Sequence, residues 1–442
     1  MPRSAFHLLA AASLLLGATS RLEAARRPRY GGTLRVELRA PRALEAAAWP
    51  MAFETLVALD ESGRPQPALA ISWRRDATGR RWQFRLRPNV KFHDGSPLAA
   101  EAVAAALGGS GWSARIAGEE VVIQAEAPTS LAEFADARRA VFARSTDGSL
   151  QGTGPFRLAQ WESRRAMLAA HEEYWAGRPF LDAVAIEMGR TAQQQFLDLE
   201  LGKADLIELG PNDVRRATQS GARIWSSAPV TLMALRFERG RPLAEDAKLR
   251  EALALSIDRA AILNVLLQKR GEAAGGLLPQ WLSGYAVLFS TARDAARARQ
   301  LVTGAPVLSL ASDPSDALAR MIADRVAVNA REVGIRLLTA TEAGYADLHL
   351  VRARISPLAS EQALVRLAAS LQLPDLLHLS SPALESLYAG ERALLEEYRV
   401  IPLFHLPEIY GARPRVKTWA TPGLLRTGEW RLDDLWLDSE LP

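Results

Sequence analysis

Several short segments of the chain alternate hydrophobic and polar residues. In residues 80–92 (RRWQFRLRPNVKF), Trp82, Phe84 and Leu86 alternate with polar side chains, and residues 33–38 read TLRVEL. Successive side chains of a β-strand point to opposite faces, so this period of two predicts half-buried strands with one face in water. Further strands are predicted within residues 119–130, 306–312, 335–341, 346–352 and 398–412.

Helical spacing is clearest in residues 246–267 (DAKLREALALSIDRAAILNVLL). Apolar residues recur there every three or four positions, as on one face of a helix. A second helix is predicted for residues 316–334, between two predicted strands, which indicates a βαβ-like unit. Because strands and helices are mixed throughout, the pattern predicts an α/β or α+β protein.

The first 24 residues differ from the rest. Arg3 precedes an apolar run from Phe6 to Ala18, and small residues follow at Ser20 and Ala24. This order is typical of a secretory signal peptide, and the run is shorter than the about 20 apolar residues of a membrane span. We predict a signal peptide over residues 1–24; a buried N-terminal helix is the alternative.

The composition argues against several kinds of partner, anchor and catalytic site. The 442 residues carry a formal charge of +4 without a block of basic residues, which argues against a nucleic-acid partner. The chain has no cysteine, so disulfides, thiol catalysis and a lipid-modified N-terminal cysteine are excluded. We expect a periplasmic protein that is exported, soluble and not lipid-anchored. Its length predicts two or three domains.

His93 and Asp94, in the segment KFHDGSPLAAEAV, look most like a catalytic or metal-binding pair. Neighbouring strand residues point to opposite faces, however, and do not easily converge on one ion. Asp94 can bond to nearby backbone, Gly95 tolerates positive φ, and Ser96 followed by Pro97 suits the start of a helix. We predict a tight turn that leads into a helix capped by Ser96.

Other motifs for chemistry are incomplete. The six histidines are dispersed, GGSGW lacks the last glycine of GxSxG, and QGTGPF does not continue as GxGxxG. We therefore predict no catalytic residue, no metal site and no cofactor.

Tryptophan is abundant, with eleven residues. Trp73, Trp82 and Trp175 are expected in hydrophobic cores. Trp49, Trp161 and Trp281 fall in loops beside predicted strands, where they are candidates for contact with a ligand in a cleft. Core packing is the alternative for these three as well.

Four blocks in a fixed order resemble the bacterial extracellular solute-binding proteins of the peptide and nickel type (family 5), which serve ABC importers. The resemblance extends from Tyr30 to about Trp419. The blocks are ALAISWRRDATGRRWQFRLRPNVKFHDGSPLAAEAV, then GTGPFRLAQWE with HEEYWAGRPFLDAVAIEM, then KLREALALSIDRAAILNVLLQKRGEAAGGLLP, and finally IPLFHLPEIYGARPRVKTW.

The resemblance implies an α/β, two-lobed periplasmic-binding-protein-like fold of type II, with mixed sheets flanked by helices and an extra small domain. Lobe I would comprise residues 30–52, 152–235 and 395–442. The small domain would comprise residues 53–151, and a shortened lobe II residues 236–394.

The resemblance also implies how the protein works. As a monomer, it would close its lobes by a hinge motion over a small organic or peptide-like solute, and the closed form would dock on the permease of an ABC importer in the inner membrane. A sensor or interaction protein without transport is the first alternative, and a periplasmic hydrolase the second.

Arg352 and Arg354 replace a feature of the family. Where its members commonly carry Tyr-Pro-Asp-Pro, whose acid meets the N-terminal amine of a bound peptide, this chain has Arg352, Arg354 and Pro357. Residues two apart in a strand share a face, and guanidinium groups favour carboxylates and phosphates. We expect both arginines in the cleft and an anionic or neutral solute; solvated surface arginines are the alternative.

Overall fold

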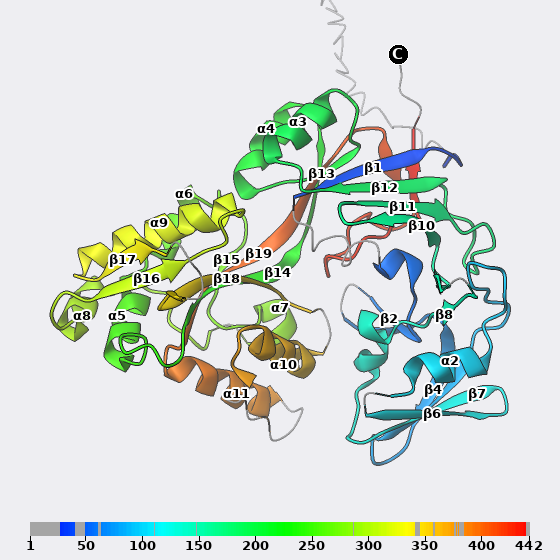
Figure 1. Cartoon of the computed structure of the whole chain (residues 1–442), viewed down its shortest axis with the longest axis horizontal. Coiled ribbons are helices and arrows are strands. Elements are labelled where there is room, and N and C mark those ends of the chain that lie inside the picture. The colour runs from blue at the N-terminus through cyan, green and yellow to red at the C-terminus, as the bar shows by residue number, and fades with distance from the viewer. Residues whose placement is uncertain are drawn as a thin grey trace, which may run out of the picture.

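The structure, a computed structural model, consists of two lobes and a small domain (Figure 1). It describes residues 27–39, 49–60, 63–109, 111–146, 148–285, 287–340, 345–356, 359–374, 377, 379 and 384–438. The predicted signal peptide and Pro357 lie outside these residues. None of the helices in these ranges combines the length and the apolar character that a membrane span requires.

One mixed sheet of eleven strands runs through both lobes. Its order is β10-β11-β12-β1-β13-β19-β14-β18-β16-β17, and β15 pairs with β19. The pairs of β1 with β12 and β13, and of β16 with β17 and β18, are parallel. The strands are β1 (Thr33–Leu38), β10 (Phe156–Glu162), β11 (Arg165–Ala170), β12 (Ala183–Met188), β13 (Leu206–Glu208), β14 (Arg223–Phe237), β15 (Glu272–Ala273), β16 (Val307–Ala311), β17 (Arg336–Thr339), β18 (Leu348–Arg354) and β19 (Val400–Ala412).

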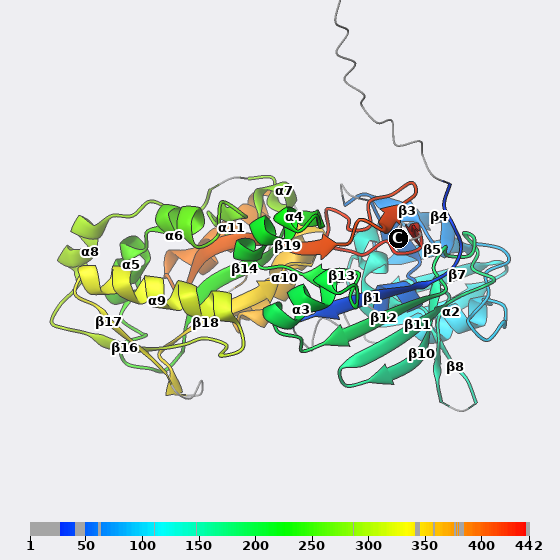
Figure 2. The same cartoon turned by 90° about the horizontal axis from the view of Figure 1, so that it is seen from above.

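Two long strands, β14 and β19, connect the lobes (Figures 1 and 2). Trp225 of β14 pairs with Tyr410 of β19 in lobe I, and Leu235 pairs with Ile401 in lobe II. Between these points the register shifts on both sides of Pro229, which faces Pro407. Proline has no N–H to donate, so two facing prolines interrupt the ladder between the lobes.

Lobe I has a core of alternating strand residues. Leu34, Val36 and Leu38 of β1 are buried, as their period of two predicts, and they pack with residues of β11 and β12. The remaining elements of this lobe are α3 (Ala192–Glu200), η3 (Pro211–Asp213), α4 (Val214–Gln219), β20 (Val416–Thr418) and β21 (Leu435–Leu437).

Lobe II covers its part of the sheet with helices. Helix α9 packs on β17, α10 on β18, and α6 and α11 on β19. The predicted βαβ-like unit is present as β16, α9 and β17, with β16 and β17 parallel. The helices are α5 (Ala247–Ser256), α6 (Arg259–Val265), α7 (Gln280–Ser283), α8 (Ala295–Leu301), α9 (Ala317–Glu332), α10 (Ser360–Ser370) and α11 (Leu384–Glu396).

Two boundaries in lobe II differ from expectation. The hydrophobic core of this lobe includes residues 232–235 of β14. It also includes Val400, Ile401, Leu403, Phe404 and Leu406 of β19, so it extends beyond residues 236–394, because both strands cross between the lobes. The helical pattern of residues 246–267 forms two helices rather than one. The chain leaves the helical conformation at Ile257, and the side chain of Asp258 caps α6 by accepting a hydrogen bond from the N–H of Ala261.

The small domain packs one helix on a four-stranded antiparallel sheet of order β4-β5-β7-β6. Trp82 and Phe84 of β5 are buried in its core, as their alternation predicts. Its elements are β2 (Val57–Leu59), β3 (Pro65–Pro67), β4 (Ala70–Arg75), β5 (Arg81–Leu86), α2 (Ala100–Leu107), β6 (Trp112–Ala117), β7 (Glu120–Ala125), η1 (Leu131–Ala135), η2 (Ala137–Arg139), β8 (Ala143–Arg144) and β9 (Leu150–Gln151).

Candidate functional site

A cavity of about 1110 Å³ lies where the two lobes and the small domain meet. Its lining includes residues 49–51 and 53–55, at the border of lobe I and the small domain, and residues 428–433 of lobe I. Residues 135–138 of the small domain and Arg354 and Arg366 of lobe II complete this part of the lining. We call this cavity the cleft. Its volume is of the order that binds a small organic ligand.

Aromatic side chains form one wall of the cleft. The ring centroids of Trp49 and Phe53 are 4.2 Å apart, and Phe142 meets Phe53 edge-on at 6.2 Å. Trp161, on the edge strand β10, also lines the cleft and leaves 44% of its surface exposed. An exposed ring in a concave site offers apolar contact area to a ligand.

Glu54 follows Phe53 in the chain, and both of its carboxylate oxygens accept hydrogen bonds. Oε1 accepts a hydrogen bond from the hydroxyl of Tyr174 at 2.9 Å, and the indole N–H of Trp175 reaches both oxygens at 3.0 Å. Burial raises the pKa of Glu54 to about 7, although these donors favour the ionised form. Glu54 therefore holds Tyr174 and Trp175 in the wall of the cleft.

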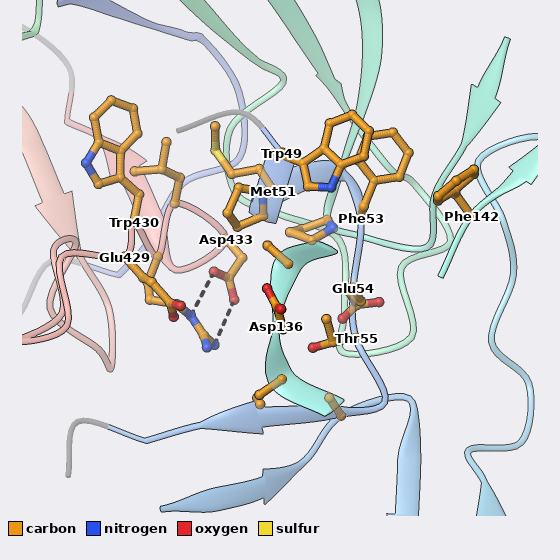
Figure 3. A pocket seen from close by; sticks show the side chains of 18 of the residues that line it. Trp49, Met51, Phe53, Glu54, Thr55, Asp136, Phe142, Glu429, Trp430 and Asp433 are labelled. Carbon is orange, nitrogen blue, oxygen red and sulfur yellow. Dashed lines mark hydrogen bonds and ion pairs between the residues drawn. The ribbon is translucent and has the colours of Figure 1, made fainter. Parts of the chain in front are cut away.

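A C-terminal segment supplies a row of charged side chains. Residues 429–433 (EWRLD) alternate, so that Trp430 and Leu432 are buried and Glu429, Arg431 and Asp433 are partly exposed. Trp430 anchors the segment by packing edge-on against Tyr410 at 5.4 Å. Figure 3 shows Glu429 and Asp433 on the side of this segment, and Glu54 on the other side of the cavity.

The charges of this row are unevenly paired. The Nε of Arg431 lies 3.4 Å from Asp433 Oδ1. Within the described parts of the chain, the carboxylate of Glu429 makes no hydrogen bond or ion pair. Burial raises the pKa of Glu429, and the positive charges of Arg354 and Arg431 oppose this shift.

Polar contacts join lobe II to the small domain across the cleft. Arg366 of α10 forms an ion pair with the buried Asp136, and its Nη1 lies 3.3 Å from Asp136 Oδ1. One turn earlier, the Nε2 of Gln362 donates to the hydroxyl of Ser130 at 3.0 Å. Asp136 also pairs with Arg138 of its own domain at 3.1 Å.

Three of the five predicted ligand residues line the cleft: Trp49, Trp161 and Arg354. The guanidinium of Arg354 is already engaged, because its Nε donates to Glu408 Oε1 at 2.8 Å and its Nη2 donates to the carbonyl oxygen of Gly428 at 3.2 Å.

Trp281 and Arg352 are not among the residues that line the cleft. The indole N–H of Trp281 donates to the carbonyl oxygen of Pro229 at 2.8 Å, beside the crossing strands. Arg352 pairs with Asp316, at the N-terminus of α9, at 3.3 Å. The ligand roles predicted for these two residues have no support from their positions.

His93 serves the backbone of a neighbouring segment. Its Nδ1 accepts a hydrogen bond from the N–H of Gly152 at 3.2 Å, and its Nε2 lies 3.1 Å from the carbonyl oxygen of Gly154. This pattern defines a neutral ring that donates from Nε2. His171 approaches the same carbonyl oxygen at 3.1 Å.

Asp94 forms the predicted turn. Its Oδ1 accepts hydrogen bonds from the N–H and the hydroxyl of Ser96 at 2.9 and 2.6 Å, and Gly95 has a φ of +84°. The turn is therefore confirmed. The prediction that Ser96 caps the helix is wrong: α2 begins at Ala100, because the hydroxyl of Ser96 is bound to Asp94 and the chain stays extended up to Ala99.

In the described ranges, no three histidine, aspartate or glutamate side chains are grouped so that they could hold a metal ion. The sequence analysis missed the charged residues of the cleft other than Arg354. A local signal existed for Glu429, Arg431 and Asp433, since EWRLD alternates charged and apolar residues. No local signal marks Glu54, Asp136 or Arg366, which come to the cleft only in the folded chain. The lining of the cleft contains all six of these charged residues: Glu54, Asp136, Arg366, Glu429, Arg431 and Asp433.

Comparison with protein families gives one match over more than half of the chain. The family described as bacterial extracellular solute-binding proteins, family 5 Middle, matches residues 64–110 and 117–337.

Two curated relatives match parts of the chain. Heme-binding protein A of Haemophilus influenzae is 30% identical over 159 residues, which is 35% of this chain and 29% of that protein. The probable D,D-dipeptide-binding periplasmic protein DdpA of Escherichia coli is 26% identical over 255 residues, 49% of this chain and 48% of that protein. The matched segment thus spans less than half the length of each relative.

Solved structures resemble the chain over nearly its whole length. NikA from Staphylococcus aureus, in complex with Ni(L-His)2, has a TM-score of 0.78 at 17% identity, covering 92% of this chain and 100% of that one. The oligopeptide-binding protein AppA from Bacillus subtilis, in complex with a nonapeptide, has a TM-score of 0.76 at 16% identity and covers 93% and 100%. These similarities confirm the predicted two-lobed α/β fold.

Proposed function

Because the chain belongs to the bacterial extracellular solute-binding proteins of family 5, we propose that it captures a small organic or peptide-like solute in the cleft and delivers it to the permease of an ABC importer. The observation that carries this proposal is the cavity of about 1110 Å³, whose lining comes from both lobes and the small domain. A solute bound there contacts both lobes at once.

The crossing strands supply the hinge of this mechanism. Pro229 and Pro407 face each other where β14 and β19 pass from lobe I to lobe II, and the register shifts on both sides of Pro229. A ladder interrupted at this point bends more easily than a continuous one. Rotation about it would open the cleft and separate Arg366 from Asp136. A solute that contacts both lobes shifts the equilibrium toward the closed form.

The family consists of solute-binding transport proteins rather than enzymes. In our proposal the solute enters and leaves chemically unchanged, and the protein works as a monomer in the periplasm, where family members act. The closed form would present both lobes to the permease.

The test combines solute identification with a measurement of closure. Protein purified gently from the periplasm should release a solute that mass spectrometry identifies. The chain has no cysteine, so Glu119→Cys and Glu385→Cys, both exposed, place two spectroscopic labels on the small domain and on lobe II. The distance between the labels should change when that solute is added back.

Absence of any released solute, with an unchanged label distance in the presence of periplasmic extract, would refute the proposal. Binding and closure without uptake of the solute by cells that carry the importer would instead identify a sensor.

A further inference from the structure

The arginines that line the cleft all have carboxylate partners. Arg138 and Arg366 pair with Asp136, and Arg431 pairs with Asp433. Arg354 pairs with Glu408 at 2.8 Å. A bound anion would have to compete with one of these carboxylates for its guanidinium group.

Glu429 is the exception among the carboxylates of the cleft. Asp136 and Asp433 face arginines, and the two oxygens of Glu54 accept hydrogen bonds from Tyr174 and Trp175. Among the described residues, nothing donates a hydrogen bond to the side chain of Glu429, although Arg354 and Arg431 are near enough to influence its charge.

The backbone holds Glu429 in this position. Its carbonyl oxygen accepts the N–H of Leu425 at 2.9 Å, which closes a tight turn with Gly428 at a φ of +78°. The next residue, Trp430, is 8% exposed and packs against Tyr410. With its neighbour fixed in the core, Glu429 lies in the lining of the cavity (Figure 3).

The formal charges around Glu429 also indicate that its carboxylate lacks a partner. The pairs of Arg354 with Glu408 and of Arg431 with Asp433 are each neutral, so an ionised Glu429 leaves one uncompensated negative charge in this part of the cleft. One positive charge is in excess elsewhere in the cleft, because Arg138 and Arg366 share the single carboxylate of Asp136. The side chain of Arg138 is 70% exposed, however, and water screens its charge. A partly buried charge gains more from a partner than an exposed one does.

We propose that the solute carries a cationic group that pairs with Glu429, attached to an apolar body that packs on Trp49 and Trp161. This inference rests on the proposed solute-binding function and adds the class of solute. It replaces the expectation of an anionic or neutral solute, which assumed that Arg352 and Arg354 were available to the solute. An aromatic wall also suits a cation, because the face of a tryptophan ring attracts positive charge.

The experiment uses three probes that share an indole ring and differ only in the head group: tryptamine, indole-3-propionamide and indole-3-propionate. Their binding to the full-length protein is measured by calorimetry at pH 7. We expect the affinity order amine, then amide, then carboxylate. Glu429→Gln, which keeps the size of the side chain, should weaken tryptamine binding at least tenfold and leave the amide within twofold.

Glu119→Gln is the matched control, because Glu119 lies in the turn between β6 and β7 and its side chain is 89% exposed. It should change none of the three affinities. Glu429→Lys is a second variant, and it should reverse the order so that indole-3-propionate binds best. Thermal melting checks that all variants fold.

The inference is overturned if tryptamine is not the preferred probe of the wild-type protein, or if Glu429→Gln leaves its affinity unchanged. It is also overturned if the solute released from periplasmic protein is neutral or anionic. In the last case the proposed function stands, because a solute was bound; release of no solute and an unchanged label distance would remove both.

Discussion

Arg366 and Asp136 form an ion pair between lobe II and the small domain, on the lining of the cleft itself. Asp136 is 6% exposed and shares its charge with Arg138, while Arg366 also reaches the hydroxyl of Ser356 at 3.2 Å. Together with the hydrogen bond from Gln362 to Ser130, this pair is a contact that exists only while lobe II is close to the small domain.

Arg366→Gln should therefore favour the open form. We expect a changed label distance in the solute-free protein and a several-fold loss of affinity for the released solute, because the solute must then provide more of the free energy of closure. Spin-label distance measurements and calorimetry test this. Arg392→Gln is the control, since Arg392 pairs with Glu396 on the exposed face of α11 in the same lobe. Equal effects of both variants would contradict the prediction.

Glu54 should make stability fall as the pH rises. Burial raises the pKa of Glu54 from 4.5 to about 7, so the folded protein binds the proton more tightly than the unfolded chain. This contribution is complete below pH 4.5 and is lost as the pH passes 7. The unfolding free energy of the wild type, relative to Glu54→Gln, should decrease across this window by on the order of 1–3 kcal/mol. Denaturant titrations at pH 4.5, 6 and 8 measure it, and a flat difference would rule it out.

His93 should make the stability of the protein fall as the pH falls. Burial lowers the pKa of His93 from 6.5 to about 4, and the nearby His171 and Arg157 add to this effect while Asp94 opposes it. The unfolded chain then binds the proton more tightly, so stability is complete above pH 6.5 and is lost as the pH falls toward 4. His93→Gln should reduce this acid sensitivity in denaturant titrations. A variant as acid-sensitive as the wild type would show that other groups dominate.

Gly152 is required by a close backbone contact. A Cβ atom there would lie 1.9 Å from the carbonyl oxygen of Ala52, far inside van der Waals contact. Gly152→Ala should destabilise the protein by more than about 2 kcal/mol, since two backbone segments must separate. The control is Gly108→Ala, where the nearest atom, the carbonyl oxygen of Ala104, is 3.1 Å away. Similar melting temperatures for both variants would refute the prediction.

Local patterns predicted much of the fold. The alternation at Trp82 and Phe84 and the βαβ-like unit of β16, α9 and β17 depend on neighbouring residues, and the structure has them. The helix break at Ile257 was missed because apolar spacing continues through it, although Asp258 is a good capping residue. Ser96 was misassigned because two structures compete for its hydroxyl: a helix cap and the Asp94 turn.

The cleft was harder to predict because its residues are distant in sequence. Glu54 meets Tyr174 and Trp175 across about 120 positions, and Asp136 meets Arg366 across 230. Arg354 was identified from its place at the end of a strand, but the partner that engages it, Glu408, comes from β19. Whether a charged side chain is paired depends on such distant partners, and local sequence patterns do not reveal which residues these are.

The crossing of β14 and β19 has a consequence for how the protein unfolds. Each strand contributes to both cores: Met233 of β14 and Phe404 of β19 pack in lobe II, and Trp225 of β14 and Tyr410 of β19 pack in lobe I. Unfolding of one lobe would therefore disrupt strands that also belong to the sheet of the other lobe. The two lobes should therefore not melt independently, and a fragment limited to residues 236–394 would lack nearly all of β14 and the whole of β19, on which α6 and α11 pack. Heating should give a single calorimetric transition in which both lobes unfold together.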